Sequence, residues 1–261
     1  MTTTIASPSP HDLIGTPSIG GNRIWNVVRL GWINRWTVLW IPAMILAFIL
    51  VVNISIWALI VANTAPVDRA DALAGTQFTG ATTYVFAYLM VISIQAINLT
   101  FPYALGLSVT RREFSLGTAI SLVLLSALWG GILTVLSYVE QWTNGWWLGG
   151  HMFTVVYFGN GPVWERLFVF VGLFLFFAFF GIAWGTVYMR WRVYGMYVMG
   201  GVLALATAGG IALLTLNHAW GDFWNWFATA GPVGVVAWML LVAAVSAVAG
   251  YFILRRATPK L

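Results

Sequence analysis

The chain has 261 residues, of which 61% are hydrophobic and only 7% are charged, and its mean hydropathy is +0.88. No water-soluble domain of this size could bury so much apolar surface, so the composition excludes a soluble protein. The apolar runs are long enough for helices, and they predict an all-α polytopic membrane protein. The formal charge of +5 does not indicate a nucleic-acid partner, because the basic residues occur in twos and threes at the ends of apolar runs.

The first 36 residues precede the apolar runs. Residues 1–21 are rich in Thr, Ser and Pro, and we predict a flexible cytoplasmic tail rather than a cleaved signal peptide. In residues 22–36, Arg23, Arg29 and Arg35 alternate with tryptophan and aliphatic side chains. This pattern predicts an amphipathic helix in the membrane surface. A juxtamembrane segment with scattered interfacial anchors fits the same residues equally well.

Residues 37–261 are predicted to form one membrane domain of six transmembrane helices, since a bilayer core about 30 Å thick takes about 20 helical residues to cross. Pro102 is expected to kink the second span or to loosen its last turns. Gly181 and Gly185 have the spacing of a close helix contact, and Ala243 and Gly250 predict tight packing of the sixth span. The predicted spans are 38–62, 81–109, 114–138, 167–189, 193–216 and 232–254.

Aromatic residues collect in two of the loops between these spans. Residues 140–164 contain four tryptophans and are expected to fold back onto the membrane interface as an aromatic belt. Residues 218–231 are also rich in Trp and Phe, and they fit a pair of half-helices that enter the membrane and return.

The distribution of basic residues predicts the orientation. Arg69 and Arg166 fall on one side of the six-span arrangement, and short loops on the cytoplasmic side carry the excess of Lys and Arg. Both termini are therefore predicted to be cytoplasmic, in a multi-pass protein of the plasma membrane. The basic residues on the predicted cytoplasmic side are Arg23, Arg29, Arg35, Arg111, Arg112, Arg190, Arg192, Arg255, Arg256 and Lys260.

The sequence lacks the patterns that indicate catalysis or nucleotide hydrolysis. It contains no cysteine, no Gly-x-Ser-x-Gly, no His-Glu-x-x-His and no Walker motif. None of the predicted spans has an ionisable group near its centre, where ion-coupled transporters usually place one. We therefore expect no catalytic residue, metal or cofactor in this chain, and the energy for any transport has to come from another subunit.

Polar side chains interrupt the second predicted span. Gln95 and Asn98 precede Pro102 on one helical face. Such a stripe either lines a substrate path or joins neighbouring helices through hydrogen bonds worth about 0.6 kcal/mol each. The residues by themselves leave both interpretations open.

Charge also separates the second span from the third. Arg111, Arg112 and Glu113 belong at a water interface, since a charged residue at the bilayer centre costs roughly 2.5 to 3.5 kcal/mol. Residues 101–117, FPYALGLSVTRREFSLG, resemble the short cytoplasmic turn in the membrane subunits of ATP-binding-cassette exporters of the second permease type. The amphipathic amino-terminal helix, the six spans and the internal termini agree with this resemblance.

The resemblance implies a permease that exports an apolar or amphipathic compound through the membrane. It implies a homodimer, or a pair with a close relative, that binds two copies of a cytoplasmic ATPase, and ATP and Mg would be bound by that ATPase. In this family the inner turn is a coupling helix that docks in a groove of the ATPase. The substrate path would lie between protomers and be lined by the second and fifth spans, with Gln95 and Asn98 as polar contacts.

Carried over to this sequence, the resemblance assigns the ATPase contact to two short segments. The alternative is that their arginines only fix the topology. A separate alternative is a non-transporting sensor, immunity or scaffold protein whose inner turns bind a cytoplasmic regulator. The larger implied contact consists of Arg111, Arg112, Glu113 and Phe114, and the smaller one of Arg190, Trp191 and Arg192.

Overall fold

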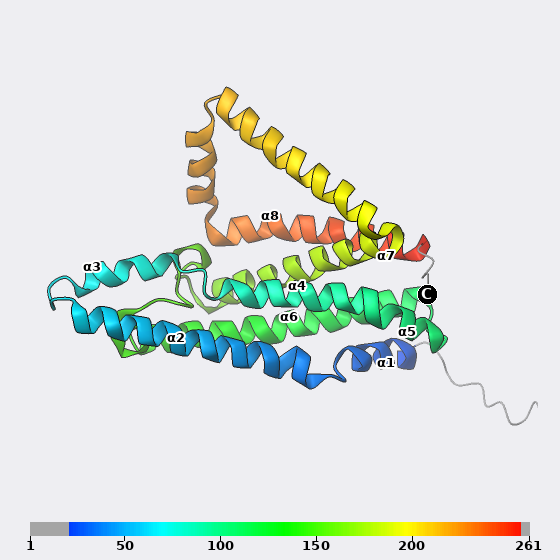
Figure 1. The fold of residues 1–261 in the computed structure, drawn as a ribbon, viewed down its shortest axis with the longest axis horizontal. Coiled ribbons are helices and arrows are strands. Elements are labelled where there is room, and N and C mark those ends of the chain that lie inside the picture. The colour runs from blue at the N-terminus through cyan, green and yellow to red at the C-terminus, as the bar shows by residue number, and fades with distance from the viewer. Residues whose placement is uncertain (1–20, 257–261) are drawn as a thin grey trace, which may run out of the picture.

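The computed structural model describes residues 21–256, which form helices joined by turns. The predicted tail up to residue 20 and the end from residue 257, with Lys260, lie outside the described residues. Most of the long helices lie side by side in an elongated bundle (Figure 1). Five helical stretches are long and apolar enough to cross a membrane, which confirms an all-α polytopic architecture. These stretches are Trp36–Asn63, Arg69–Gly106, Arg111–Trp142, Val163–Leu216 and Trp220–Arg255.

The elements follow one another along the chain with short connections. The π-helical turns η1 and η3 continue directly into α2 and α5, so each belongs to a longer helical stretch. In order, the elements are α1 (Gly21–Gly31), η1 (Trp36–Trp40), α2 (Ile41–Asn63), α3 (Arg69–Ala74), η2 (Gly75–Phe78), α4 (Thr83–Gln95), η3 (Ala96–Thr100), α5 (Phe101–Gly106), α6 (Arg111–Trp142), η4 (Gly145–Gly149), η5 (Val156–Phe158), α7 (Val163–Leu216) and α8 (Trp220–Arg256).

The amphipathic helix α1 packs lengthwise against the first turns of α6, which differs from our prediction of a helix lying flat in the membrane surface. Val27 is buried, and a Cβ atom added at Gly117 would stand only 2.6 Å from the Cβ atom of Val27. Further along both helices, a Cβ atom at Gly31 would stand 2.7 Å from Ser121 Oγ. The two contacts advance in the same direction, so the helices run parallel. The apolar face of α1 is therefore used to pack on protein.

Two prolines account for the π-helical turns η1 and η3. Pro42 and Pro102 each come two residues after such a turn, and the turn contains the residue four positions before the proline, Val38 or Asn98. Proline has no N–H for that carbonyl, and its ring crowds it, so the helix widens there. The carbonyl oxygen of Val38 instead accepts a hydrogen bond of 3.3 Å from the indole of Trp129. The predicted distortion at Pro102 is confirmed as a widened turn.

Glycine positions determine which helices approach closely. A Cβ atom at Gly181 would stand 2.6 Å from the carbonyl oxygen of Met90, so α7 and α4 nearly touch through their backbones. Gly185 extends this contact by one turn, and a Cβ atom there would stand 3.2 Å from Ile97. On α8, Gly250 faces Ile182 of α7. The close packing predicted from these small residues is confirmed.

The fourth and fifth predicted spans form one helix of 54 residues, α7, whose backbone breaks at Arg192 (φ 55°, ψ −141°). A straight α-helix of this length would measure about 81 Å, far more than a bilayer core. Each side of the break is long enough for one crossing. The structure thus has five long helical stretches in place of six separate spans, because no loop separates the fourth from the fifth.

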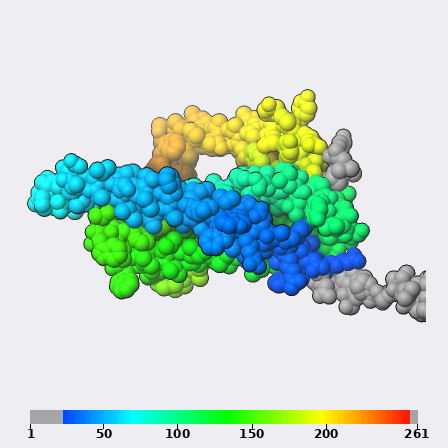
Figure 2. All heavy atoms as spheres, turned by 60° about the horizontal axis from the view of Figure 1, so that its bottom comes forward, coloured from blue at the N-terminus to red at the C-terminus, as the bar shows by residue number. Residues whose placement is uncertain are grey.

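Beyond the break, α7 leaves the bundle. Residues 193–230, which we call the arm, comprise the rest of α7 and the first part of α8 and are mostly exposed. Figure 1 shows the arm in yellow and orange, angled away from the other helices, and Figure 2 shows an open gap beneath it. A second break, at Gly231 (φ 62°) before Pro232, returns the chain to the bundle. Where we predicted a pair of half-helices at 218–231, the structure has one short helix, residues 220–230.

The loop between α6 and α7 is built around one buried carboxylate. Glu140 has an exposed fraction of 0%. Its oxygens accept hydrogen bonds of 2.9 to 3.1 Å from the backbone N–H groups of Met152, Phe153 and Thr154. The hydroxyl of Thr154 and the indole of Trp146 donate to the same carboxylate at 2.6 and 3.3 Å. This carboxylate fixes the course of the loop.

The tryptophans of this loop divide into two groups. Trp142 and Trp147 are 89% and 80% exposed, as expected of an aromatic belt. Trp146 instead donates to Glu140, and the loop also buries Met152 and Phe153. The segment is consequently a packed cap over one end of the bundle as well as a source of interfacial aromatic side chains.

Candidate functional site at the arginine end

One end of the bundle, which we call the arginine end, brings together three places where the chain turns or ends. There α6 begins at Arg111, α7 breaks at Arg192, and α8 reaches Arg255. These lie at the right of Figure 1, opposite the cap around Glu140. The structure therefore gathers at one end the arginines that the sequence places in separate turns.

The turn between α5 and α6 is tight and well ordered by hydrogen bonds. Thr110 begins α6 with a capping box: its hydroxyl accepts from the N–H of Glu113 at 3.2 Å, and its own N–H donates to the Glu113 carboxylate at 2.9 Å. A reciprocal cap of this kind satisfies two backbone donors and fixes the first turn of the helix. Glu113 thus holds the shape of the turn, while Arg112 is left exposed.

Phe114 does not lie on the surface of this turn. It is 1% exposed, and its ring lies 5.0 Å from the ring of Phe101, which is fully buried. A buried ring cannot touch a partner directly, which is at variance with the docking contact that the resemblance implied for Phe114. The residue instead anchors the turn to the core, because it is the first apolar position of α6 on the side that faces α5 and α1.

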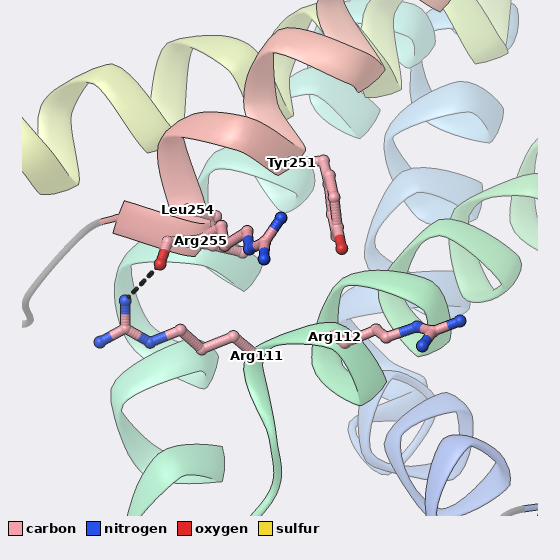
Figure 3. Close-up of a pocket in the computed structure, with 5 residues that line it drawn as sticks. All are labelled: Arg111, Arg112, Tyr251, Leu254 and Arg255. Atoms are coloured by element: carbon pink, nitrogen blue, oxygen red, sulfur yellow. Dashed lines mark hydrogen bonds between the residues drawn. The ribbon is translucent and has the colours of Figure 1, made fainter.

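A cleft of about 580 Å³ separates the start of α6 from the end of α8 (Figure 3). The guanidinium of Arg111 donates a hydrogen bond of 2.8 Å to the backbone carbonyl of Arg255 across its mouth. Figure 3 shows Arg255 and Tyr251 on the α8 side of the cleft, facing the first turn of α6, and Arg112 pointing away from Arg111. The remaining lining residue is Leu254. Guanidinium groups are donors only, so the cleft suits an anionic group.

An apolar groove of about 340 Å³ adjoins this cleft. Tyr251 and Leu254 line both spaces, so the groove continues the cleft along the bundle. Its other walls come from η3, α6, α7 and α8 and are mostly apolar, with Ser115 and Thr118 among the few polar residues. The arginine end therefore offers a charged compartment that is continuous with an apolar one.

A third cavity, of about 240 Å³, lies between α1, α4, α6 and the π-helical turns η1 and η3. Its lining combines polar and apolar side chains, and Gln95 is one of the polar residues. Asn98 does not line it, and within the described part of the chain its buried Oδ1 atom has no hydrogen-bond donor. The π turn accounts for this separation, because it shifts the helical register between the two residues. The other polar lining residues are Asn34, Thr37, Thr100, Thr118 and Ser121.

The second predicted contact lies at the break in α7. The guanidinium of Arg190 stacks over the ring of Trp191, with 4.8 Å between the guanidinium carbon and the ring centre. Trp191 is 47% exposed, and Arg192 occupies the left-handed region of backbone conformation, which is uncommon for a residue with a side chain. These residues form an exposed corner at the arginine end.

Two features of the structure were missed at the level of sequence. Arg255 and Tyr251 face the start of α6 only because two distant helix ends meet, and no local pattern signals this. Glu140 had a weak signal: it is the single acidic residue at the end of an apolar run, directly before a glycine-rich loop whose amides need acceptors.

The arginine end combines a rigid turn, exposed cationic side chains and a cleft that continues into an apolar groove. This combination is chemically suited to contact with an anionic group. The chain matches no protein-family model, no curated protein sequence and no solved structure, so its function has to be inferred from this geometry.

Proposed function

We propose that the chain is the membrane subunit of an ATP-binding-cassette exporter, with the ATPase on a separate cytoplasmic chain that docks at the arginine end. The observation that carries the proposal is the turn at Thr110–Glu113, which is fixed by a capping box and anchored by buried Phe114. Conformational changes of an ATPase can move membrane helices only if the contact between the two proteins is rigid. This turn opens the 32-residue helix α6, so a displacement of the turn moves a rod that crosses the membrane.

The proposed topology has six crossings, with both termini and the arginine end in the cytoplasm. It treats the two parts of α7 on either side of Arg192 as separate crossings. The excess of arginine at this end supports the orientation, because short cytoplasmic loops retain Lys and Arg. The transported compound is proposed to be apolar or amphipathic, and Gln95 is the polar residue of the proposed path that lines a cavity.

A second copy of the chain is proposed to cover the arm. A Cβ atom added at Gly200, Gly201, Gly209 or Gly210 would meet nothing within 4 Å. In contrast, Gly181 in the bundle lies against a neighbouring backbone. Small residues on membrane helices commonly mark the surfaces at which helices approach closely. Of these glycines, Gly201 and Gly209 lie on overlapping sides of the helix and form such a surface, and within the described residues no part of the same chain covers it.

Replacing both Gly201 and Gly209 by leucine is expected to abolish self-association. The two glycines lie about two turns apart on overlapping sides of the arm, and leucine side chains would hold a partner helix away. We expect the detergent-solubilised chain to change from a dimer to a monomer, measured by light scattering. Thr207→Leu adds bulk on the other side of the arm and should leave the dimer intact. A dimer that persists in the double variant would exclude this interface.

The charge reversal Arg112→Glu is expected to weaken ATPase binding at least tenfold. A surface of the ATPase that is complementary to the Arg112 guanidinium would repel a carboxylate at this position or leave it unpaired. The measurement is co-purification of the tagged chain with a co-expressed ATPase, followed by titration of the purified components. Arg29→Glu makes the same change at an exposed position of α1 and should leave binding unaltered. Binding that survives Arg112→Glu would remove the docking assignment, and retention of a regulator without ATPase activity would favour a sensor or scaffold.

A further inference from the structure

We propose that the cleft between α6 and α8, together with the apolar groove beside it, binds one anionic phospholipid. The phosphate is placed between Arg111 and Arg255, and an acyl chain lies in the groove beyond Tyr251 and Leu254. This inference does not depend on the proposed transport function. It would hold equally for a membrane sensor or scaffold.

The charge of the cleft indicates an anionic ligand. Three of its five lining residues are arginines, and the other two, Tyr251 and Leu254, carry no acidic group. The nearest acidic residue along the chain, Glu113, is held in the capping box with Thr110. Arg111 uses one N–H for the carbonyl of Arg255, and a guanidinium has five. Donors therefore remain for a phosphate, and its charge would offset the repulsion among the arginines.

The shape of the adjoining space indicates that the ligand also has an apolar part. The groove of about 340 Å³ shares two walls with the cleft, so a bound molecule can occupy both without leaving the surface of the protein. Leu116, Val248 and Phe252 line the groove and are 42%, 56% and 56% exposed. The groove is thus open along the side of the bundle, where acyl chains surround a membrane protein.

The position of the site favours a lipid over a soluble anion. The cleft lies where α6 begins and α8 ends, between the apolar helix surfaces and the arginines that mark the membrane–water interface. Phospholipid phosphates lie at this level of a bilayer, and basic pockets between helices on the cytoplasmic side bind anionic headgroups. A free phosphate would satisfy the arginines but would leave the groove empty.

The test is equilibrium binding to the full chain in a neutral detergent, read out by native mass spectrometry. The probes are phosphatidylglycerol, phosphatidylcholine with matched chains, and inorganic phosphate. Phosphatidylglycerol is expected to bind at least tenfold more tightly than phosphatidylcholine. Arg255→Gln and Arg111→Gln should each weaken it roughly ten- to hundredfold, since each removes a charge-assisted bond. Arg255→Lys should retain most of the binding, and Arg29→Gln removes an arginine outside the cleft and should have no effect.

The groove is tested separately with Ala247→Phe, which narrows it without a change of charge. Phosphatidylglycerol is expected to bind this variant at least tenfold more weakly, while the thermal midpoint stays near that of the wild type. Equal affinity for the two lipids, or full affinity in both arginine variants, would overturn the proposal. So would millimolar inorganic phosphate that displaces the lipid completely, because the site would then be one for soluble anions.

Discussion

Replacing Glu140 by leucine is expected to lower the free energy of unfolding by about 3 to 5 kcal/mol. The change removes the shared acceptor of three buried backbone N–H groups, those of Met152, Phe153 and Thr154. Each buried donor left without a partner costs about 1 to 3 kcal/mol. The hydroxyl of Thr154 and the indole of Trp146 lose the same partner. The measurement is reversible unfolding in mixed micelles, titrated with a denaturing detergent.

Two further variants separate the hydrogen bonds from the charge. Glu140→Gln keeps one acceptor oxygen but turns an NH₂ group toward donors, so an intermediate loss of stability is expected. Glu165→Gln makes the same chemical change at the start of α7, close in sequence to the cap, and should alter stability by less than about 0.5 kcal/mol. If Glu140→Leu were as stable as the wild type, the carboxylate would not organise the cap.

Introducing leucine at Gly181 is expected to separate α7 from α4 and to destabilise the bundle by about 3 kcal/mol, the upper part of the usual range for overpacking. The added Cβ atom would meet the backbone carbonyl of Met90 at 2.6 Å and the Cβ atom of Ser93 at 3.0 Å. A backbone neighbour cannot rotate out of the way as a long side chain can. The same unfolding titration measures the loss.

The matched control is Gly131→Leu in α6, where an added Cβ atom meets nothing within 4 Å. Replacement of a helix-interior glycine there should be neutral or stabilising by up to about 1 kcal/mol, because glycine is a poor helix former. Similar losses in both variants would mean that helix propensity or membrane insertion, rather than the contact of α7 with α4, decides the outcome.

The comparison of Gly181 with Gly209 also shows what a sequence motif leaves open. Both residues lie in the glycine-containing apolar helix α7, Gly181 before the break at Arg192 and Gly209 after it, and small residues on membrane helices commonly mark surfaces that helices can approach closely. In the structure only Gly181 has a neighbour, and Gly209 faces open space on the arm. The pattern therefore predicts that a surface can be approached closely. Whether the approaching helix belongs to the same chain depends on where the backbone breaks, here at Arg192 and Gly231.

The features that could be predicted from the residues alone are those that depend on local composition and on the membrane as solvent. Long apolar runs are stable only in a bilayer, which determines the class of fold. Arginines are stable at the edges of the bilayer, which determines where the runs end, and Pro102 cannot continue a regular helix, which accounts for the distorted turn. The arginine turn at Arg111 and Arg112 was predictable for the same reason.

Which surfaces these elements present depends on contacts between helices that are distant in the chain. The amphipathic face of α1 fits a membrane surface as well as it fits α6, and the pairing with Gly117 selects the second. Phe114 is buried because α5 folds back against it, and Arg255 joins Arg111 because two helix ends 144 residues apart meet. Apolar packing and hydrogen bonding act between groups that are close in space, and sequence patterns report only on groups that are close along the chain.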